Sequence, residues 1–347
     1  MRMKPKTNEC ELIVFGKGVG ESILFRVTKD KWIVIDSFIS NDTGKPVAIE
    51  YLESRNIDIE KIIGVICTHW DDDHIRGISN IIEMHTTPLP VVLPIALKED
   101  KVKEYVFLGS DNDIGKTTEF INVLKLKKEK RCTFCWAESD RNLFGKAISD
   151  SNIIFKALSP NDEQYEEFLK SLTLPKAGEK KIYSYSENSI SVALFAKNHV
   201  DTFLFGGDLE TSELGGWKDI CDNYHESTKS HIFKIPHHGS KTAYYDGVWT
   251  DLVDNPIAII TRFNRSHLPK DDMIENIGKN SSKLYIVGPE PKKDRNIMRK
   301  KLKSAGMLKD ALIIDNKYGY VRLHRDNNSV EWTAEIYGSV KELSVLK

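Results

Sequence analysis

The sequence lacks any apolar run of about 18 residues that would span a membrane, and its start, MRMKPKTNEC, is polar where a secretory signal is apolar. We therefore expect no membrane partner and, by default, a cytoplasmic location. Cysteine is also scarce, because 5 cysteines, an odd number in 347 residues, do not make a disulfide framework. The thiols are predicted to be reduced and mostly structural.

An excess of one charge is lacking as well, because 50 Lys and Arg offset 51 Asp and Glu and leave a formal net charge of −1. This balance gives no global electrostatic argument for binding nucleic acid or a membrane surface. Local basic runs occur at residues 125–131 (KLKKEKR) and 291–303 (PKKDRNIMRKKLK). Each run could be a binding surface or the solvated face of a helix.

Strand-like and helix-like patterns alternate along the whole chain. Residues 11–15, 22–27 and 32–36 are rich in β-branched and aromatic residues, which predicts an antiparallel meander. Further strands are expected at residues 61–68, 89–95, 153–158, 189–195, 202–205, 231–235 and 257–261, and helices at 77–84, 214–224 and 271–277. This order predicts an α/β sandwich of two facing sheets with helices outside.

No linker is apparent, so residues 1–347 are interpreted as a single domain. Residues 311–347 contain three further strand-like segments, ALIID, YVRLH and WTAEIY. We expect these segments to be strands added to the sheet at the C-terminal end of the domain.

The segment HWDDDH at residues 69–74 follows an apolar strand and precedes a helix. A loop in this position is held rigidly, so His69, Asp71, Asp73 and His74 can converge on cations. The alternative is a polar turn whose acidic residues cap the helix, but that leaves both histidines unexplained. The spacing therefore predicts a metal site.

Asp208 follows an apolar strand and the dipeptide Gly206-Gly207. Glycines permit close backbone approach, and a carboxylate at the end of a strand could bridge two metal ions. The alternative is an ordinary Gly-Asp turn. Both interpretations remain open for this residue taken alone.

A pair of adjacent histidines, His237 and His238, also follows an apolar strand, in the segment KIPHHGS. Adjacent side chains point to different sides, so one can bind a metal while the other orients, donates a proton or contacts substrate. His267, in RFNRSHLP, is a weaker candidate, since a structural or surface histidine is equally consistent with that segment.

Taken together, these segments resemble the metallo-β-lactamase superfamily, and more narrowly the hydrolase module of the ComEC-type DNA-uptake proteins. The segments GVGESI and VIDS resemble the opening strands of that branch, and ENSISV at residues 187–192 resembles its Asn/Ser-bearing strand. The resemblance implies the metallo-β-lactamase αββα sandwich, with two facing mixed sheets and helices outside.

The resemblance also implies roles for individual residues. His69 and Asp71 would serve one metal ion and Asp73 and His74 a second, with Asp208 between the ions. His237 or His238 would complete a ligand shell, and His267 would be a ligand or substrate contact. Asn188 or Ser191 occupies the region where many relatives have another histidine, and both are expected, with Lys234 and Ser240, to contact substrate.

Two departures from the family pattern affect these expectations. Asp71 stands where the superfamily usually has histidine. The carboxylate makes the ligand set harder and richer in oxygen, which extends the expected metal from Zn²⁺ to Mn²⁺. The uptake proteins carry membrane segments, and this sequence has none, so DNA uptake itself is not expected.

We therefore predict a metal-dependent hydrolase in which two divalent ions, Zn²⁺ or Mn²⁺, activate a water molecule. Asp73, His237 and His238 are the candidate catalytic residues, and one of the two histidines protonates the leaving oxygen. A phosphodiester is the preferred substrate, because two cations suit its attacking and leaving oxygens. The partner would be single-stranded nucleic acid or a small phosphodiester, with Lys234, Lys241 and residues 291–303 near its phosphates.

Two alternatives remain. The near-neutral charge favours a small ester, lactone, amide or cyclic nucleotide as substrate. The chain could also be a non-catalytic regulatory module that keeps the fold, but a complete set of carboxylates and histidines is costly to retain without a metal.

Overall fold

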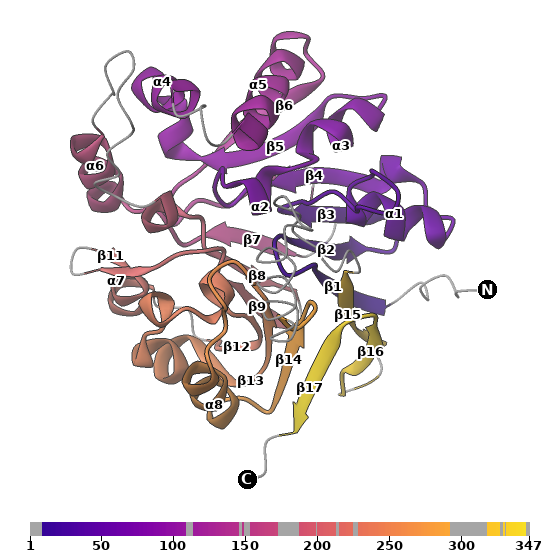
Figure 1. Ribbon diagram of the computed structural model, residues 1–347, viewed down its shortest axis with the longest axis vertical. Helices are drawn as coiled ribbons and strands as arrows, with labels where there is room; N and C mark the ends of the chain where they lie inside the picture. The colour runs from indigo at the N-terminus through magenta and orange to yellow at the C-terminus, as the bar shows by residue number, and fades with distance from the viewer. Residues whose placement is uncertain are drawn as a thin grey trace, which may run out of the picture.

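The structure is a computed structural model that describes residues 9–108, 114–145, 148, 153–172, 187–198, 200–212, 215–224, 228–291, 318–326, 329 and 331–344. Two large mixed sheets face each other, and helices cover their outer sides (Figure 1). This arrangement confirms the predicted αββα sandwich. Within the described ranges, no helix is both long and apolar enough to cross a membrane.

The first sheet has 8 strands in the order β16-β15-β1-β2-β3-β4-β5-β6. The predicted antiparallel meander is confirmed as β1 to β3, and β3 to β6 then run parallel to one another. The strands are β1 (Glu9–Gly16), β2 (Glu21–Thr28), β3 (Lys31–Ile35), β4 (Ile62–Ile66), β5 (Leu89–Pro94), β6 (Cys132–Ala137), β15 (Gly319–Asp326) and β16 (Thr333–Tyr337).

The second sheet has 7 strands in the order β17-β14-β13-β12-β9-β8-β7. Its central strands β9, β12, β13 and β14 are parallel, and the outer strands pair antiparallel. Outside this sheet, β10 (Thr211–Ser212) pairs with β11 (Gly215–Gly216). The strands of the second sheet are β7 (Ile154–Ala157), β8 (Leu194–Lys197), β9 (Thr202–Phe205), β12 (Ser230–Lys234), β13 (Val253–Thr261), β14 (Lys283–Val287) and β17 (Val340–Ser344).

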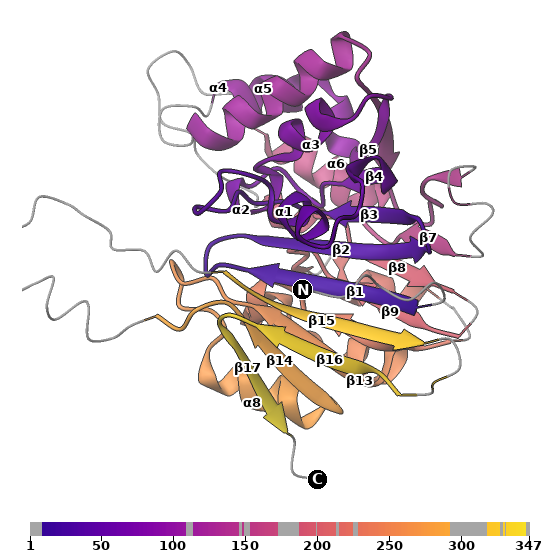
Figure 2. The ribbon, with the colours of Figure 1, turned by 90° about the vertical axis from the view of Figure 1, so that its right-hand side faces the viewer.

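Helices flank both sheets (Figure 2). They are α1 (Val47–Ser54), α2 (Asp72–Ile75), α3 (Ile78–Met84), α4 (Asp100–Leu108), α5 (Ile114–Lys128), α6 (Asp162–Ser171), α7 (Trp217–Asn223) and α8 (Asp271–Lys279). Shorter helical turns are η1 (Ile59–Lys61), η2 (Ile95–Lys98), η5 (Glu187–Ile190), η6 (Pro236–Gly239), η7 (Lys241–Ala243) and η8 (Val248–Leu252).

The strand expected over residues 189–195 was wrong except at its last two residues. Glu187–Ile190 forms a 3-10 turn, and β8 begins only at Leu194. Strands β14 and β17 had not been expected. Of the C-terminal segments, YVRLH lies in β15 and WTAEIY overlaps β16, both in the first sheet, whereas ALIID lies outside the described residues.

The main core lies between the two sheets and is built from the inward side chains of both. Phe25 of β2 makes an edge contact with Phe203 of β9, with ring centroids 4.9 Å apart, and both rings are fully buried. Burial of such apolar surface is the dominant stabilising term of a fold of this kind. Separate apolar clusters lie between each sheet and its outer helices.

Strand directions bring the ends of several strands to one rim of the sandwich. Strands β9, β12 and β13 are parallel, so the residues that follow each of them emerge at the same edge. In the first sheet β3 and β4 also run parallel, and the antiparallel β2 begins where β3 ends. The backbone N–H of Val192 donates to the carbonyl of Thr68 (2.9 Å), which joins the two sheets at this rim.

Candidate metal centre

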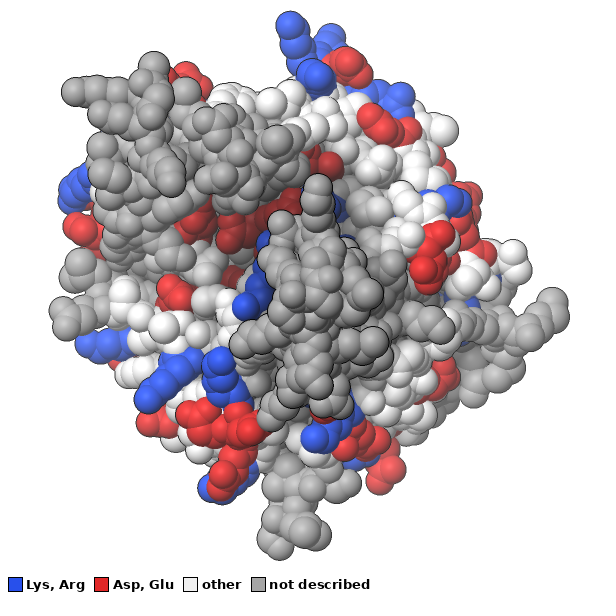
Figure 3. Space-filling model, viewed as in Figure 1, with Lys and Arg blue, Asp and Glu red and all other residues white. Residues whose placement is uncertain are grey.

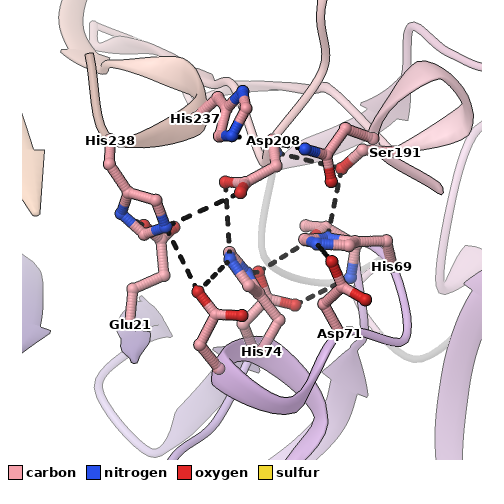
Figure 4. A network of polar contacts seen from close by, with 12 residues as sticks. Glu21, His69, Asp71, His74, Ser191, Asp208, His237 and His238 are labelled. Atoms are coloured by element: carbon pink, nitrogen blue, oxygen red, sulfur yellow. Dashed lines mark hydrogen bonds and ion pairs between the residues drawn. The ribbon is translucent and has the colours of Figure 1, made fainter. Parts of the chain in front are cut away.

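The HWDDDH segment forms the loop from β4 into the single turn of α2. Trp70, which lies between the candidate ligands His69 and Asp71, is 1% exposed and packs on Phe168. It therefore fixes the loop to the core. The N–H groups of His74 and Ile75 both donate to the carbonyl of Asp71 (2.9 Å each). The tight turn therefore places His74 beside His69 and Asp71 (Figure 4), and Asp73 lies next to His74.

Four side chains from three separate loops face a common space. The Nε2 atom of His74 lies 3.4 Å from Oδ1 of Asp208 and 3.5 Å from Oδ2 of Asp73. The Nε2 atom of His238 lies 3.3 Å from Oδ2 of Asp73 and 3.6 Å from Oδ2 of Asp208. On the other side of His74, Nε2 of His69 lies 3.7 Å from Oδ2 of Asp71.

Hydrogen bonds to the outer ring nitrogens fix how these histidines face the space. Nδ1 of His74 lies 2.8 Å from Oδ2 of Asp36, and Nδ1 of His238 lies 3.1 Å from the carbonyl oxygen of Thr261. A carboxylate and a carbonyl only accept, so each Nδ1 carries the hydrogen that it donates. In the neutral ring the lone pair is then on Nε2, which faces the common space.

His69 is held in the same way through Thr68. The hydroxyl of Thr68 donates to Oδ2 of Asp36 (2.7 Å), so its oxygen is the acceptor for Nδ1 of His69, 3.2 Å away. The Asp36 carboxylate also accepts from the backbone N–H of Thr68 (2.7 Å). One buried aspartate therefore orients both His69 and His74.

Several inward-facing atoms are buried and have no hydrogen-bond partner within the described part of the chain. They are Nε2 of His69, Nε2 of His74 and Oδ1 of Asp208, whose contacts with charged groups are the ion-pair distances of 3.4 to 3.7 Å given above. Buried polar atoms without a partner are rare because their desolvation is uncompensated. Imidazole nitrogens and carboxylate oxygens are the ligands that Zn²⁺ and Mn²⁺ take in proteins, so these atoms fit a divalent cation.

The charges of the cluster are strongly coupled. Burial lowers the pKa of His74, but the carboxylates of Asp208, Asp73 and Asp36 raise it to well above its ordinary value. Burial raises the pKa of Asp208, but His74 and His238 lower it to well below the ordinary value. The concentrated negative charge of Asp73 and Asp208 is thus a property that would favour a cation at this place.

Two glycines allow Asp208 to reach the cluster. A Cβ atom on Gly206 would lie 2.6 Å from Cβ of Pro236, and one on Gly207, whose φ is +51°, would lie 2.7 Å from Oγ of Ser191. The backbone N–H of Asp208 donates to Oγ of Ser191 (3.0 Å), which is itself fully buried and 3.4 Å from Nδ1 of His69. Ser191, expected to contact substrate, is therefore placed where it orients Asp208.

The two adjacent histidines face different partners because both have left-handed backbone angles, with φ of 43° at His237 and 53° at His238. His237 is only partly buried, and its Nδ1 lies 3.1 Å from Oε1 of Glu210. Its Nε2 lies 3.3 Å from Nδ2 of Asn188. His238 therefore faces the cluster, and His237 stands beside it as an imidazole–carboxylate pair with Glu210.

A buried ion pair supports His238. Nζ of Lys234 lies 2.7 Å from Oε2 of Glu21, and both side chains are at most 1% exposed. The same oxygen of Glu21 accepts from the hydroxyl of Thr261 and lies 3.7 Å from Nδ1 of His238. Lys234 was expected to contact substrate, but its ammonium is enclosed and paired, so we do not propose it as a substrate contact.

The remaining expected residues lie farther from the common space. Oγ of Ser240 accepts from the backbone N–H of Thr242 and caps η7. His267 has an exposed side chain in the turn that follows β13 and does not belong to the cluster. Lys241 is exposed, whereas residues 292–303 of the basic run lie outside the described residues.

Sequence reasoning missed Glu21, Asp36 and Glu210. Glu21 is one of a group, with His74, Asp208 and His238, whose ligand atoms all lie within 4.8 Å of one another. Glu21 begins β2 and Asp36 follows β3 at the rim where β4 delivers His69. The sequence signal that could have identified Glu21 and Asp36 is a carboxylate at the end of a strand on this rim.

Comparison with known proteins gives one family match and a set of similar folds. Residues 16–110 match the metallo-beta-lactamase superfamily. YhfI from Bacillus subtilis is 13% identical, with a TM-score of 0.44, covering 82% of this chain and 97% of its own. Zn²⁺-bound PqqB from Methylobacterium extorquens is 8% identical, with a TM-score of 0.46, covering 81% of this chain and 98% of its own.

The short form of human tRNase Z is 9% identical, with a TM-score of 0.39, and the match covers 78% of this chain and 88% of that one. No curated protein matches the sequence. The family match runs from the last residue of β1 to the end of α4 and includes the whole HWDDDH loop. Residues 16–110 thus carry the signature of the metallo-beta-lactamase superfamily, within a chain whose described residues form the αββα sandwich.

Proposed function

We propose that this protein is a metal-dependent hydrolase that cleaves phosphodiester bonds, as a phosphodiesterase or nuclease. The observation that carries the proposal is the set of buried, inward-facing atoms on His69, His74 and Asp208 that have no hydrogen-bond partner among the described residues. A structural polar cluster would satisfy those atoms internally. In a metal centre these atoms remain available as ligands for the cation.

The ligand atoms divide into two sets, which is the basis for proposing two divalent ions. His69 and Asp71 would hold one ion, Asp73, His74 and His238 the other, and Asp208 would lie between them. The distances of 3.3 to 3.6 Å from Nε2 of His238 to the Asp73 and Asp208 carboxylates support His238, and not His237, as the ligand. The first set has one imidazole and is richer in oxygen, which favours Mn²⁺ beside Zn²⁺.

Bound divalent ions would supply Lewis-acid polarisation of the scissile group and a lowered pKa for water. The chain itself supplies the remaining chemistry. Asp36 and Thr261 hold the ring nitrogens of His74 and His238 in one orientation, which keeps the ligands preorganised. His237, partly exposed and held by Glu210, is the group we propose to donate a proton to the leaving oxygen.

The test is hydrolysis by purified protein loaded with Mn²⁺ or Zn²⁺. Single-stranded DNA, RNA and bis(p-nitrophenyl) phosphate are the substrates, and Asp208→Asn is the matched variant. We expect metal-dependent cleavage of at least one substrate by the wild type and none by the variant. Absence of cleavage in a wild type that holds its metal would contradict the phosphodiesterase assignment.

A small substrate such as an ester, lactone, amide or cyclic nucleotide is the second candidate. The net charge of −1 and the burial of Lys234 favour it, because both reduce the charge available to a phosphate backbone. Neutralising Lys292, Lys293, Arg299, Lys300 and Lys301 distinguishes the two candidates. A nuclease would bind nucleic acid less tightly and with a weaker salt dependence after this change, whereas an enzyme of small substrates would be unaffected.

A further inference from the structure

Lys17 is a partly buried cation in the turn between β1 and β2. Its Nζ donates to the carbonyl of Ile39 (3.0 Å) and lies 5.0 Å from the centre of the Phe38 ring. No carboxylate of the described residues forms an ion pair with it. An ammonium has three hydrogens to donate, and the contact with Ile39 uses one of them.

The segments around Lys17 are joined to two proposed metal ligands. The carbonyl of Gly18 accepts from the backbone N–H of Asn264 (2.6 Å), and the neighbouring Phe263 stacks on His238 with ring centroids 5.0 Å apart. On the other side, Phe38 follows Ser37, whose N–H donates to the carbonyl of His74 (2.7 Å). Lys17 is therefore linked through its neighbours to both His74 and His238.

The charges of two arginines act on Lys17. Arg76 follows α2 and pairs with Asp72 (2.8 Å), whereas Arg265 follows β13 and is exposed. Burial and the charge of Arg76 lower the pKa of Lys17 to about 8, Arg265 adds to this, and Asp72 and Asp73 oppose it. In Figure 3, acidic side chains gather over α2 and Lys or Arg side chains lie beside them.

We propose that Lys17, with Arg76 and Arg265, binds a phosphate oxyanion of the substrate beside the metal-binding cluster. A phosphate offers several acceptor oxygens to the unused donors of Lys17 and to the two guanidinium groups. It also offsets the repulsion that Arg76 and Arg265 exert on Lys17. This inference deepens the proposed function and rests on it for the identity of the substrate.

The experiment measures the binding of inorganic phosphate to the metal-loaded protein by calorimetry, with Lys17→Met, Lys17→Arg and the control Lys29→Met. Lys29 is exposed at the opposite end of β2, so its substitution removes the same charge away from the site. We expect Lys17→Met to weaken phosphate binding by about tenfold or more, because it removes charged hydrogen bonds. Lys17→Arg and Lys29→Met should bind phosphate nearly as the wild type does.

The pH dependence separates an ionic role from a structural one. Lys17 is protonated below its pKa of about 8, so phosphate affinity of the wild type should fall as the pH rises through 8. In Lys17→Arg this loss should be absent, since a guanidinium remains charged. Equal pH profiles for the two proteins, or unchanged phosphate binding by Lys17→Met, would overturn the inference. Tighter binding of acetate than of phosphate would overturn the choice of phosphate.

The measurements distinguish failure of this inference from failure of the proposed function. Hydrolysis of a phosphodiester with an unchanged KM in Lys17→Met would leave the function standing and remove the role of Lys17. Phosphate binding that depends on Lys17, in a protein that hydrolyses no phosphodiester, would keep the oxyanion site and remove the function. The metal content of each variant is measured alongside, and it should match that of the wild type.

Discussion

Lys234 and Glu21 form a fully enclosed ion pair, with Nζ and Oε2 2.7 Å apart, next to the ring of His238. The pair joins β12 of one sheet to the start of β2 in the other. Each charge is buried, so each depends on the other for compensation. This dependence leads to a prediction about stability.

Lys234→Met should lower the free energy of unfolding by about 3–5 kcal/mol, because it leaves the carboxylate of Glu21 buried without its counter-ion. Urea unfolding measures this change. The exposed pair Lys279–Glu275, with an N–O distance of 2.6 Å, supplies the control. Lys279→Met should lower the free energy of unfolding by about 1 kcal/mol or less.

The double variant Glu21→Gln with Lys234→Met tests the same pair. Removing both charges leaves neither one uncompensated, so the double variant should be less destabilised than the sum of the two single variants. Additive effects, or a Lys234→Met protein as stable as the Lys279→Met control, would show that the pair does not behave as a coupled unit.

The two adjacent histidines should have separable effects. His238→Gln should remove about one equivalent of bound metal, since Nε2 of His238 faces the Asp73 and Asp208 carboxylates. His237→Gln should keep the metal and lower kcat by about 100-fold or more, because it removes the proposed proton donor. Metal analysis and steady-state kinetics measure both. Metal loss in His237→Gln, with a metal-replete His238→Gln, would reverse the two roles.

The success and failure of the sequence predictions have physical reasons. His69 to His74 form a dense local pattern that few structural roles explain, so the sequence alone singled out this loop as a candidate. Asp36 and Glu21 are single carboxylates whose partners, Thr68, His74 and Lys234, come from other segments of the chain, and the sequence does not show those contacts. The sequence likewise left the choice between His237 and His238 open, because it depends on two left-handed backbone angles.

The unexpected burial of Lys234 has a similar origin. Lysine is almost never fully buried unless it is paired, so an exposed, substrate-facing ammonium was the natural expectation. Its burial depends on Glu21, which is distant in the sequence and adjacent only after the two sheets pack. The expected strand over residues 189–195 failed because Glu187–Ile190 turns back to orient Asn188 and Ser191 near the cluster.

Asp36→Asn should weaken metal binding by about 10- to 100-fold, although Asp36 is not itself a proposed ligand. Its carboxylate accepts hydrogen bonds from Thr68 and lies 2.8 Å from Nδ1 of His74. An amide group cannot accept all of these bonds. Competition with a metal chelator measures the affinity, and Asp58→Asn, at the exposed cap of η1, is a matched control. Equal affinity in the two variants would show that Asp36 has no orienting role.

Asp208→Asn should abolish hydrolysis while the protein remains folded. Its carboxylate lies within 3.6 Å of Nε2 of His238 and 3.4 Å of Nε2 of His74, and a neutral amide balances cationic charge less well. Thermal unfolding checks the fold, and the phosphodiesterase assay checks activity. An active Asp208→Asn protein, with rates near wild type and its metal in place, would identify Asp208 as an ordinary turn residue.

The most direct test of the proposed metal centre is the metal content of the purified protein after equilibration with Zn²⁺ or Mn²⁺ and removal of free ions. We predict about two equivalents in the wild type. We predict one or fewer in the double variant Asp73→Ala with His74→Ala, which removes ligands from the second set. A wild type that retains no metal, or a double variant with the metal content of the wild type, would contradict the account.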